Sequence, residues 1–349
     1  MPFEVKSERM TPTIEISIKG KWKVVPALHV DGNAIVVKGN WIRTAVIDAE
    51  DWLETEIASP ESCISKLKER RSGGMRADIF AFSQKIPASR PRYAYHSNLE
   101  SYAYVHVINF NEWWTKLPQE TRKNVRRSQK RGVTISIKEV DDRLVRDLVQ
   151  LNNDSPVRQG KRFTHYGKTF EQVKKDQMFF LDRSDYICAY VGEELIGVLK
   201  LVYRRDSASI LTFVSKSSHA DKRPSNALLA KAVECCEAKG ISYLVYGKLN
   251  YGNKRESSLR DFKIRHGFEE ILVPRYYVPL TWWGALCVRL GVHRGLLSVL
   301  PPRAIAIGVS VRAKCYKLWH LIAGVAQLVE RSNRNRQTER SIPPAGSNT

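Results

Sequence analysis

The chain has 349 residues and a formal net charge of +21, because 57 lysines and arginines outnumber 36 acidic residues. A chain of this length can bury a sizeable core and suits about two domains, so it needs no disulfide or metal to hold it together. Its six cysteines and eight histidines form no CxxC motif and no metal-ligand spacing, which predicts reduced thiols, a cytoplasmic protein and no metal site. The sequence contains neither the apolar core of a signal peptide nor a run of about eighteen uncharged apolar residues, so secretion and membrane spanning are not expected.

The positive charge favours partners that are polyanions, which include nucleic acid, phosphorylated cofactors and an anionic membrane leaflet. It does not choose among them. The sequence lacks a GxSxG motif, a Walker loop and a dinucleotide fingerprint, which argues against a hydrolase, a kinase or a dehydrogenase.

Residues 1–110 are predicted to form a first, smaller α/β domain. Apolar and polar residues alternate between residues 13 and 48, as in half-buried strands. A helix is expected from Pro60 to Arg71, and further strands are expected over Asp78–Gln84 and Tyr102–Asn109.

The next segment, Asn111–Arg131, contains the most basic helix of the chain, with its regular part beginning at Pro118. A narrow apolar stripe is available for packing, and cations occupy the other faces: Lys116, Arg122, Lys123, Arg126, Arg127, Lys130 and Arg131. A solvated helix face is the ordinary explanation. The functional alternative is a clamp for the phosphates of a nucleic acid or of an activated carrier.

A central unit follows a predicted antiparallel meander over residues 186–216. Its last strand, Ser209–Lys216, opens into a basic loop, and a helix starts at Pro224 and stops at Gly240. A strand over Ile241–Tyr246 and a short helix over Ser258–His266 complete the unit. The strand, loop and helix start form a turn that suits a phosphate.

This order of elements, which ends in Phe262-Lys263-Ile264-Arg265-His266-Gly267-Phe268, resembles the GNAT superfamily of N-acetyltransferases. Together with residues 117–133 (LPQETRKNVRRSQKRGV), the ending FK-x-x-x-GF resembles the branch that includes the Fem-type peptidoglycan aminoacyltransferases and related cell-envelope acyltransferases. The resemblance covers roughly residues 111–280, and residues 14–110 only by their organisation. It implies an α/β fold in which helices flank a GNAT-like mixed sheet, with two GNAT-like units and the recognisable one over residues 111–280.

The resemblance implies an activated donor, either acyl-CoA (such as acetyl-CoA) or aminoacyl-tRNA. Acetyl-CoA enzymes of the superfamily usually carry Arg or Gln, then Gly, then Gly or Ala in the pyrophosphate loop, whereas this chain has Lys222, Ser225 and Ala227. A helix start can hold an anion through its backbone N–H groups, but a side chain at Ser225 stands where close approach favours glycine. The alternative is an ordinary capped helix. The residues predicted to bind the donor are Lys216, Lys222, Arg223, Ser225 and Asn226.

Acyl transfer to an amine needs a base, a proton donor for the leaving group and polarisation of the carbonyl. In the polar loop over residues 153–168, His165 is the best candidate base and Tyr166 a candidate donor, although His165 could equally bond a loop carbonyl. The resemblance also implies an acidic tyrosine after the fifth strand, and Tyr246 or Tyr251 stands near that place; either could equally be a packed aromatic residue. The cations suited to an anionic substrate are Arg158, Arg162 and Lys168.

The C-terminal part divides into three segments. Residues 274–280 (PRYYVPL) are predicted to form a terminal strand that covers the sheet edge. Residues 281–323 mix tryptophans and leucines with arginines and lysines, as in amphipathic helices that lie on an anionic membrane or dock on their own domain. Residues 324–349 resemble the peptide that results when a tRNA gene is translated in an unintended frame, and their composition predicts disorder.

The sequence is therefore interpreted as a cytoplasmic N-acyltransferase, or aminoacyltransferase, that acts on an amino group of a cell-envelope or glycan precursor. Its expected partners are a small-molecule or lipid-linked glycan or peptide substrate, tRNA if the donor is aminoacyl-tRNA, and the inner face of an anionic membrane as a peripheral contact. The alternative is a non-catalytic module on a degenerate GNAT scaffold that binds a polyanion or lipid.

Overall fold

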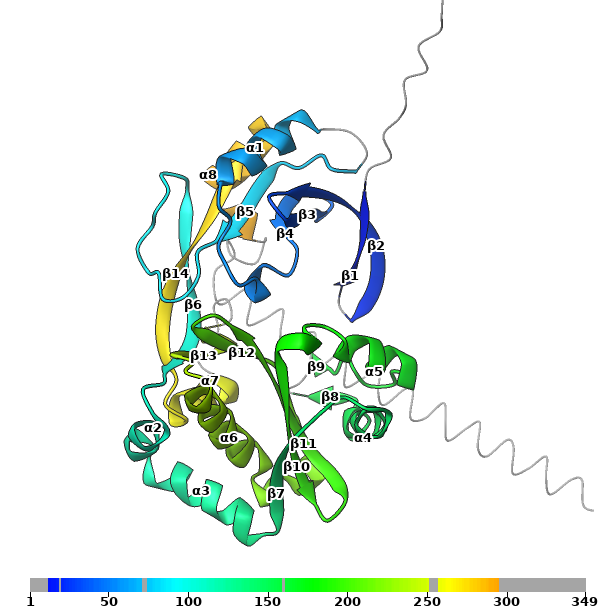
Figure 1. The fold of residues 1–349 in the computed structure, drawn as a ribbon. Helices are drawn as coiled ribbons and strands as arrows, with labels where there is room; N and C mark the ends of the chain where they lie inside the picture. Colours follow the sequence, from blue (N-terminus) through cyan, green and yellow to red (C-terminus); the bar gives the residue numbers. More distant parts are fainter. Residues whose placement is uncertain (1–11, 19, 71–73, 159–160, 251–256, 295–349) are drawn as a thin grey trace, which may run out of the picture. The chain divides into compact units, whose positions relative to one another are not determined.

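A computed structural model describes residues 12–294 except residues 19, 71–73, 159–160 and 251–256. The chain divides into two compact units, Met1–Leu290 and Gly291–Thr349. Almost all of the second unit, including the predicted tail over residues 324–349, lies outside the described residues, as does Tyr251. The fold below is that of the first unit (Figure 1).

Within the described residues, twelve strands form one sheet in the order β1-β2-β3-β4-β5-β14-β6-β13-β12-β11-β10-β7. The strands that precede the basic helix are β1 (Thr13–Ile18), β2 (Lys21–Val30), β3 (Asn33–Lys38), β4 (Thr44–Ile47), β5 (Ile79–Ser83) and β6 (Ser97–His106). The later strands of this sheet are β7 (Val133–Lys138), β10 (Ser184–Val191), β11 (Glu194–Arg204), β12 (Ser207–Ser215), β13 (Tyr243–Lys248) and β14 (Glu269–Pro279). A short separate hairpin joins β8 (Val157–Arg158) to β9 (Lys161–Arg162).

Helices flank this sheet, and the predicted mixed α/β architecture is confirmed. The α-helices are α1 (Pro60–Glu69), α2 (Phe110–Lys116), α3 (Gln119–Lys130), α4 (Asp142–Asn152), α5 (Phe170–Gln177), α6 (Pro224–Ala238), α7 (Ser258–Arg265) and α8 (Trp282–Arg289). Short 3-10 helices are η1 (Glu50–Trp52), η2 (Leu181–Arg183), η3 (Ser217–Lys222) and, in the second unit, η4 (Val292–Arg294). The predicted basic helix is divided at Leu117 and Pro118, because Leu117 is extended before the proline.

The two halves of the sheet repeat one pattern. In the first half β3 pairs antiparallel with β4, the chain crosses over through α1, and β5 pairs parallel with β4. In the second half β11 pairs antiparallel with β12, the chain crosses over through α6, and β13 pairs parallel with β12. A parallel pair needs such a helical crossover, so each half carries the same strand-helix-strand unit.

The halves are joined because they exchange strands. β6 follows β5 in the chain but pairs with β13, and β14 follows β13 but pairs with β5. β6 and β14 also pair with each other at the centre of the sheet. The prediction that residues 274–280 cover a sheet edge was therefore wrong: they belong to β14, between β5 and β6, and local composition cannot reveal so distant a partner.

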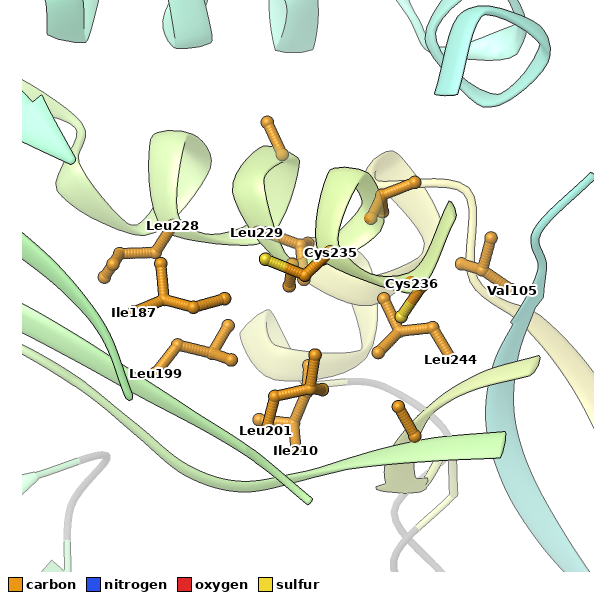
Figure 2. Close-up of a cluster of buried hydrophobic side chains, with 14 of the residues drawn as sticks. Val105, Ile187, Leu199, Leu201, Ile210, Leu228, Leu229, Cys235, Cys236 and Leu244 are labelled. Atoms are coloured by element: carbon orange, nitrogen blue, oxygen red, sulfur yellow. The ribbon is translucent and has the colours of Figure 1, made fainter. Parts of the chain in front are cut away.

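Both faces of the second half are covered. α6 lies on one face beside α3, and α4 and α5 lie on the other (Figure 1). Apolar side chains of β11 therefore pack on both faces of the sheet. Ile196 and Leu199 belong to the apolar cluster beneath α6, and Leu195 and Val198 belong to the cluster beneath α4. Figure 2 shows the α6 side, where Leu228, Leu229, Cys235 and Cys236 face strand residues such as Leu201 and Leu244.

The cysteines described by the structure, Cys63, Cys188, Cys235, Cys236 and Cys287, are buried free thiols. Burial raises the pKa of the Cys235 thiol to about 11, so it carries little thiolate at neutral pH. Among the described residues, the helices are too short or too polar to cross a bilayer.

Candidate functional site

A cavity of about 590 Å³ opens between the N-terminal strands and the second half of the sheet. The first half contributes Ile16, Trp22, Lys38 and the segment 46–52, which includes η1. The second half contributes His165, Asp176, Gln177, Phe179, Phe180, Leu211, Thr212 and Arg275. Of the residues predicted from sequence to do chemistry, this cavity contains His165.

His165 pairs with an aspartate that the sequence did not single out. Its Nδ1 lies 3.4 Å from Oδ2 of Asp176, and the same oxygen accepts a hydrogen bond of 2.5 Å from Nζ of Lys168. Trp22 Nε1 donates to the other oxygen, at 3.2 Å. Burial acts to raise the pKa of Asp176, but the hydrogen bonds from His165 and Lys168 outweigh it and lower the pKa, so the carboxylate stays ionised.

The pairing determines what His165 can do. When Nδ1–H donates to Asp176, the lone pair is on Nε2, which can then accept a proton. An ionised aspartate stabilises the imidazolium that results. This is the arrangement of a general base and the group that orients it.

The helix that carries Asp176 has strong starting signals. Thr169 accepts a hydrogen bond from the backbone N–H of Gln172, and the Gln172 side chain accepts one from the backbone N–H of Thr169, which makes a capping box. Asp176 lies in the last turn of this helix, where the helix dipole disfavours a carboxylate. The contacts from His165 and Lys168 compensate for that position.

A buried lysine holds the floor of the cavity in place. Lys200 of β11 is 1% exposed, and its Nζ donates to the carbonyl of Gln177, at 3.0 Å, and to that of Phe179. Burial lowers its pKa to about 8. Tyr186 donates to the same Gln177 carbonyl at 2.8 Å. Lys200 and Tyr186 together therefore hold the end of α5 that lines the cavity.

A second cavity, of about 120 Å³, shares Asp51 and Trp52 with the first and reaches Val245 and Gly247 of β13. Arg204 and Lys85 line it. Arg204 donates to the Asp51 carbonyl at 2.5 Å and to Oγ of Ser209 at 2.8 Å, while its buried Nε has no hydrogen-bond partner among the described residues. Lys85 donates to the Glu50 carbonyl, and its pKa is lowered to about 8 by burial and then by the Arg204 charge.

Glu50 joins η1 to the neighbouring strands β5 and β14 beside these cavities. Its carboxylate accepts from the Ser83 backbone N–H at 2.6 Å and from Arg275 of β14 at 3.2 Å. Burial raises the pKa of Glu50, and the Arg275 charge and the Ser83 hydrogen bond oppose that rise. Arg275 and Glu50 are 225 residues apart in the chain, so no spacing in the sequence predicts that they form a pair.

The predicted donor-binding turn already holds a carboxylate. Asp154, from the loop after α4, accepts hydrogen bonds from the backbone N–H of Ser217, at 2.8 Å, and from Oγ of Ser218, at 3.3 Å. Arg158 lies 3.6 Å from Asp154 and donates to the Ser215 carbonyl at 2.7 Å. The amides just past β12 thus attract an anion, and the chain supplies one.

The side chains predicted to bind the donor have contacts of their own. Lys216 pairs with Glu194 at 2.6 Å, and Oγ of Ser225 lies 3.0 Å from Oγ of Ser215. Asn226 is buried, with its side-chain amide 2.9 Å from Nε2 of His266. Lys222 is half-buried, whereas Arg223 is exposed, with a φ of 57° where it precedes α6. Neither cavity described above is lined by any of these residues.

The basic helix lies next to this turn. Arg131, at the end of α3, donates to the backbone carbonyl of Asp221 in η3, and the same nitrogen lies 3.2 Å from its carboxylate. Lys123 and Lys130 of α3 are exposed, and no ion pair joins either one to another described residue. The exposed cations of α3 and those of the turn therefore form one positively charged surface.

β12 and β13 separate beside the turn. They pair over only three positions, Ser207–Ser209 with Tyr243–Val245, although both strands continue. The FK-x-x-x-GF ending fills the gap: Phe262 packs near Phe213, with ring centroids 6.0 Å apart, and buried Lys263 donates to the carbonyls of Tyr246 and Lys248. This explains the motif as packing.

The remaining predicted residues are dispersed. Tyr246 packs its ring against Phe213 and Phe268, with Nζ of Lys263 4.3 Å from the ring centroid. Tyr166 and Arg162 are exposed on the polar loop. The structure therefore places His165 and Lys168 together at Asp176, and Arg158 at the turn instead. The roles assigned to all of these residues stay predictions.

The chain matches no protein-family model and no curated protein. Several solved structures are similar to it. The crystal structure of FemX is 10% identical, with a TM-score of 0.49, over 75% of this chain and 87% of that chain. The C-terminal domain of a putative lysylphosphatidylglycerol synthetase from Agrobacterium fabrum is 15% identical, with a TM-score of 0.49, over 76% and 87%. A tandem GNAT protein from the clavulanic acid biosynthesis pathway is 10% identical, with a TM-score of 0.43, over 74% and 82%. At these identities the likenesses concern the fold alone.

Proposed function

We propose that this chain is an N-acyltransferase that moves an aminoacyl or acyl group to an amino group of a cell-envelope or glycan precursor. The observation that supports it best is the His165–Asp176 pair in the wall of a cavity to which both halves of the sheet contribute. A cavity of about 590 Å³ lies within the range of small-molecule sites. A substrate amine in it would lie beside a base.

The proposed chemistry uses His165 as general base. The amine nitrogen attacks the carbonyl carbon of the donor, a new N–C amide bond forms, and the ester C–O bond to the tRNA ribose breaks. The amine proton passes to Nε2 of His165 and from there to the departing ribose oxygen, so protons balance. Asp176 keeps the ring oriented and stabilises the imidazolium.

The proposed donor is aminoacyl-tRNA. The positive surface over α3 and the turn suits an extended polyanion, because phosphate contacts from several lysines and arginines act additively. Asp154 at the turn works against a pyrophosphate in the same place, since the two anions would repel. Acyl-CoA is the competing donor.

Two measurements test this proposal. Titration with uncharged tRNA and with CoA separates the donors: steep salt-dependent tRNA binding supports aminoacyl-tRNA, and binding of CoA alone selects acyl-CoA. Transfer of a radiolabelled amino acid from a charged tRNA pool to a UDP-linked peptidoglycan pentapeptide then tests the reaction. A His165-independent product would remove His165 as the base, and the absence of any transfer with either donor to this and other amine acceptors would reject the enzyme.

A second candidate is a non-catalytic module that binds a polyanion or lipid. The self-supplied carboxylate of Asp154 favours it, because that side chain occupies the turn where a GNAT-like donor is expected. In that case tRNA or lipid binding persists, no transfer occurs, and the His165→Gln variant binds as the unaltered chain does.

A further inference from the structure

A third hollow, larger than the two cavities above, lies beside the first half of the sheet and shares no residue with the cavity at His165. Its volume is about 1,120 Å³, and it runs between the β3–β4 turn, the strand β14 and the start of α8. The end of α1 contributes Lys68 to it, and the start of α8 contributes Trp282. Its lining residues include Trp41, Arg43, Lys68, Arg76, Trp282 and Trp283. We refer to it as the Trp–Arg groove.

Tryptophans form its apolar rim. Trp282 is 78% exposed and Trp41 is 55% exposed. Trp283 lies between them, with ring centroids 5.5 Å from Trp41 and 5.9 Å from Trp282, and its Nε1 donates to the Trp41 carbonyl at 3.3 Å. Three adjoining indoles, two of them exposed and one half-buried, therefore face solvent, and such amphipathic rings favour a membrane–water interface.

The apolar surface continues along α8. Leu286 is 38% exposed and Leu290 is 59% exposed. Together with Trp282 they recur every four residues, so they share one helix face. Large apolar side chains are usually exposed singly, and a contiguous row marks an interaction surface.

Cations flank the same surface. Arg43, Lys68 and Arg76 line the groove, and no ion pair or side-chain hydrogen bond joins them to other described residues. The acidic residue in the lining, Asp78, is buried and occupied: its carboxylate accepts from the Arg43 backbone N–H at 2.9 Å and from Thr281 at 3.0 Å. None of the three side chains thus forms an ion pair in the part of the chain that the structure describes.

The sequence around α8 indicates the charge of the occupant. Residues 271–329 contain no aspartate and no glutamate, but they contain Arg275, Arg289, Arg294, Arg303, Arg312, Lys314 and Lys317. The chain's own C-terminal segment therefore cannot neutralise the groove through residues 291–329. An occupant that is anionic and apolar satisfies both the cations and the indoles.

We propose that the Trp–Arg groove and the exposed face of α8 dock on a membrane surface that bears anionic phospholipid. The indoles and leucines enter the interface, and the three cations contact lipid phosphates. This surface does not depend on the reaction proposed above, and a protein without transferase activity would still bind vesicles through it.

The test uses the full chain and two kinds of vesicle, phosphatidylcholine alone and phosphatidylcholine with phosphatidylglycerol. We expect co-sedimentation that requires phosphatidylglycerol and weakens with salt. The variant Arg43→Gln/Lys68→Gln/Arg76→Gln should lower the partition coefficient by about tenfold or more, since each cation near an anionic surface contributes measurably. The variant Trp41→Ser/Trp282→Ser should lower it as well, and it removes two exposed side chains without opening the core.

The matched control is Lys21→Gln/Lys23→Gln/Arg205→Gln, which removes three exposed cations elsewhere. Circular dichroism establishes that each variant is folded. Equal losses in the control and the groove variant, or equal recovery with neutral vesicles, would overturn the proposal. A groove variant with unchanged vesicle binding but faster proteolysis of its C-terminal segment would assign the groove to that segment instead, which also overturns it.

Discussion

The carboxylate of Asp154 and the backbone N–H of Ser217 are 2.8 Å apart across 63 residues of chain. The amide belongs to the first residue of η3, and the aspartate lies in the loop that follows α4. The turn therefore binds a carboxylate of its own chain. The negative charge of Asp154 repels any further anion that approaches the turn.

Removal of the Asp154 charge should strengthen donor binding. In Asp154→Asn the side-chain oxygen can still accept from Ser217, so the turn keeps its shape while one negative charge disappears. We expect tRNA affinity to rise by about fivefold at low salt, the magnitude of one nearby charge in water. Asp142→Asn, on the exposed start of α4, removes the same charge and should have little effect. Equal changes in the two variants would indicate net charge alone.

Loss of the two α3 lysines should reduce the salt dependence of tRNA binding. Lys123→Gln/Lys130→Gln removes two exposed cations, so the slope of log K against log salt should fall by about 1.5 to 2 if both contact phosphates. Lys21→Gln/Lys23→Gln on β2 removes two cations away from this surface. A slope that falls as far in the β2 variant would show that α3 makes no direct contact.

Substitution of the His165–Asp176 pair should reduce transfer more than binding. His165→Gln removes the proposed base, and the expected loss in kcat is about 10²- to 10⁴-fold. Asp176→Asn keeps the shape but not the charge, so the imidazolium that forms during transfer is no longer stabilised and kcat should fall as well.

The measurement is kcat for transfer under saturating donor, together with the affinity for the donor. His29→Gln, an exposed histidine of β2, is the matched control and should keep the original kcat. An unchanged kcat in both His165→Gln and Asp176→Asn would mean that this pair does not act in the transfer.

Local patterns predicted much of the fold. The meander β10–β11–β12 and the helix α6 follow from alternation and from Pro224 and Gly240, which act within a few residues of chain. The position of β14 did not follow, because Arg275 meets Ser83 only after the two halves exchange strands. Pairing between remote segments depends on tertiary packing. The composition of a single strand does not predict which strand it pairs with.

The candidate site was predicted only in part. His165 stood out because an imidazole titrates near neutral pH and lay in a polar loop. Asp176 carried no signal, since one acidic residue in a helix is common, and only the fold brings it to 3.4 Å from the ring. Glu50, Arg204 and Arg275 were missed for the same reason.

Replacement of buried Lys200 should change how stability depends on pH. Its folded-state pKa of about 8 lies below the unfolded value of 10.5, so the unfolded chain binds more protons between these pH values. The free energy of unfolding therefore rises as pH increases from about 8 to about 10.5, by up to roughly 3 kcal/mol from this group. In Lys200→Met this part of the rise should vanish, and the Gln177 and Phe179 carbonyls lose their donor.

Denaturant unfolding at several pH values between 7 and 10.5 measures the difference between the variant and the unaltered chain. Other shifted groups, including Lys85 and Lys263, cancel in that difference. Lys123→Met, an exposed lysine, should leave the slope unchanged. Parallel pH curves for Lys200→Met and the unaltered chain would contradict a buried lysine with a lowered pKa.

Gly284 of α8 should tolerate no side chain, because a Cβ built there would lie 1.9 Å from the Asp78 carbonyl oxygen. At an open helix position, Gly→Ala stabilises by about 0.5–1 kcal/mol. Here the clash with the Asp78 backbone forces α8 away from the start of β5, and we expect a loss of about 1–3 kcal/mol in the free energy of unfolding. Because the same shift displaces Trp283 from Trp41, vesicle binding should weaken together with stability. Denaturant unfolding gives the sign, and a Gly284→Ala chain that is as stable as the original would show that α8 does not rest on Asp78.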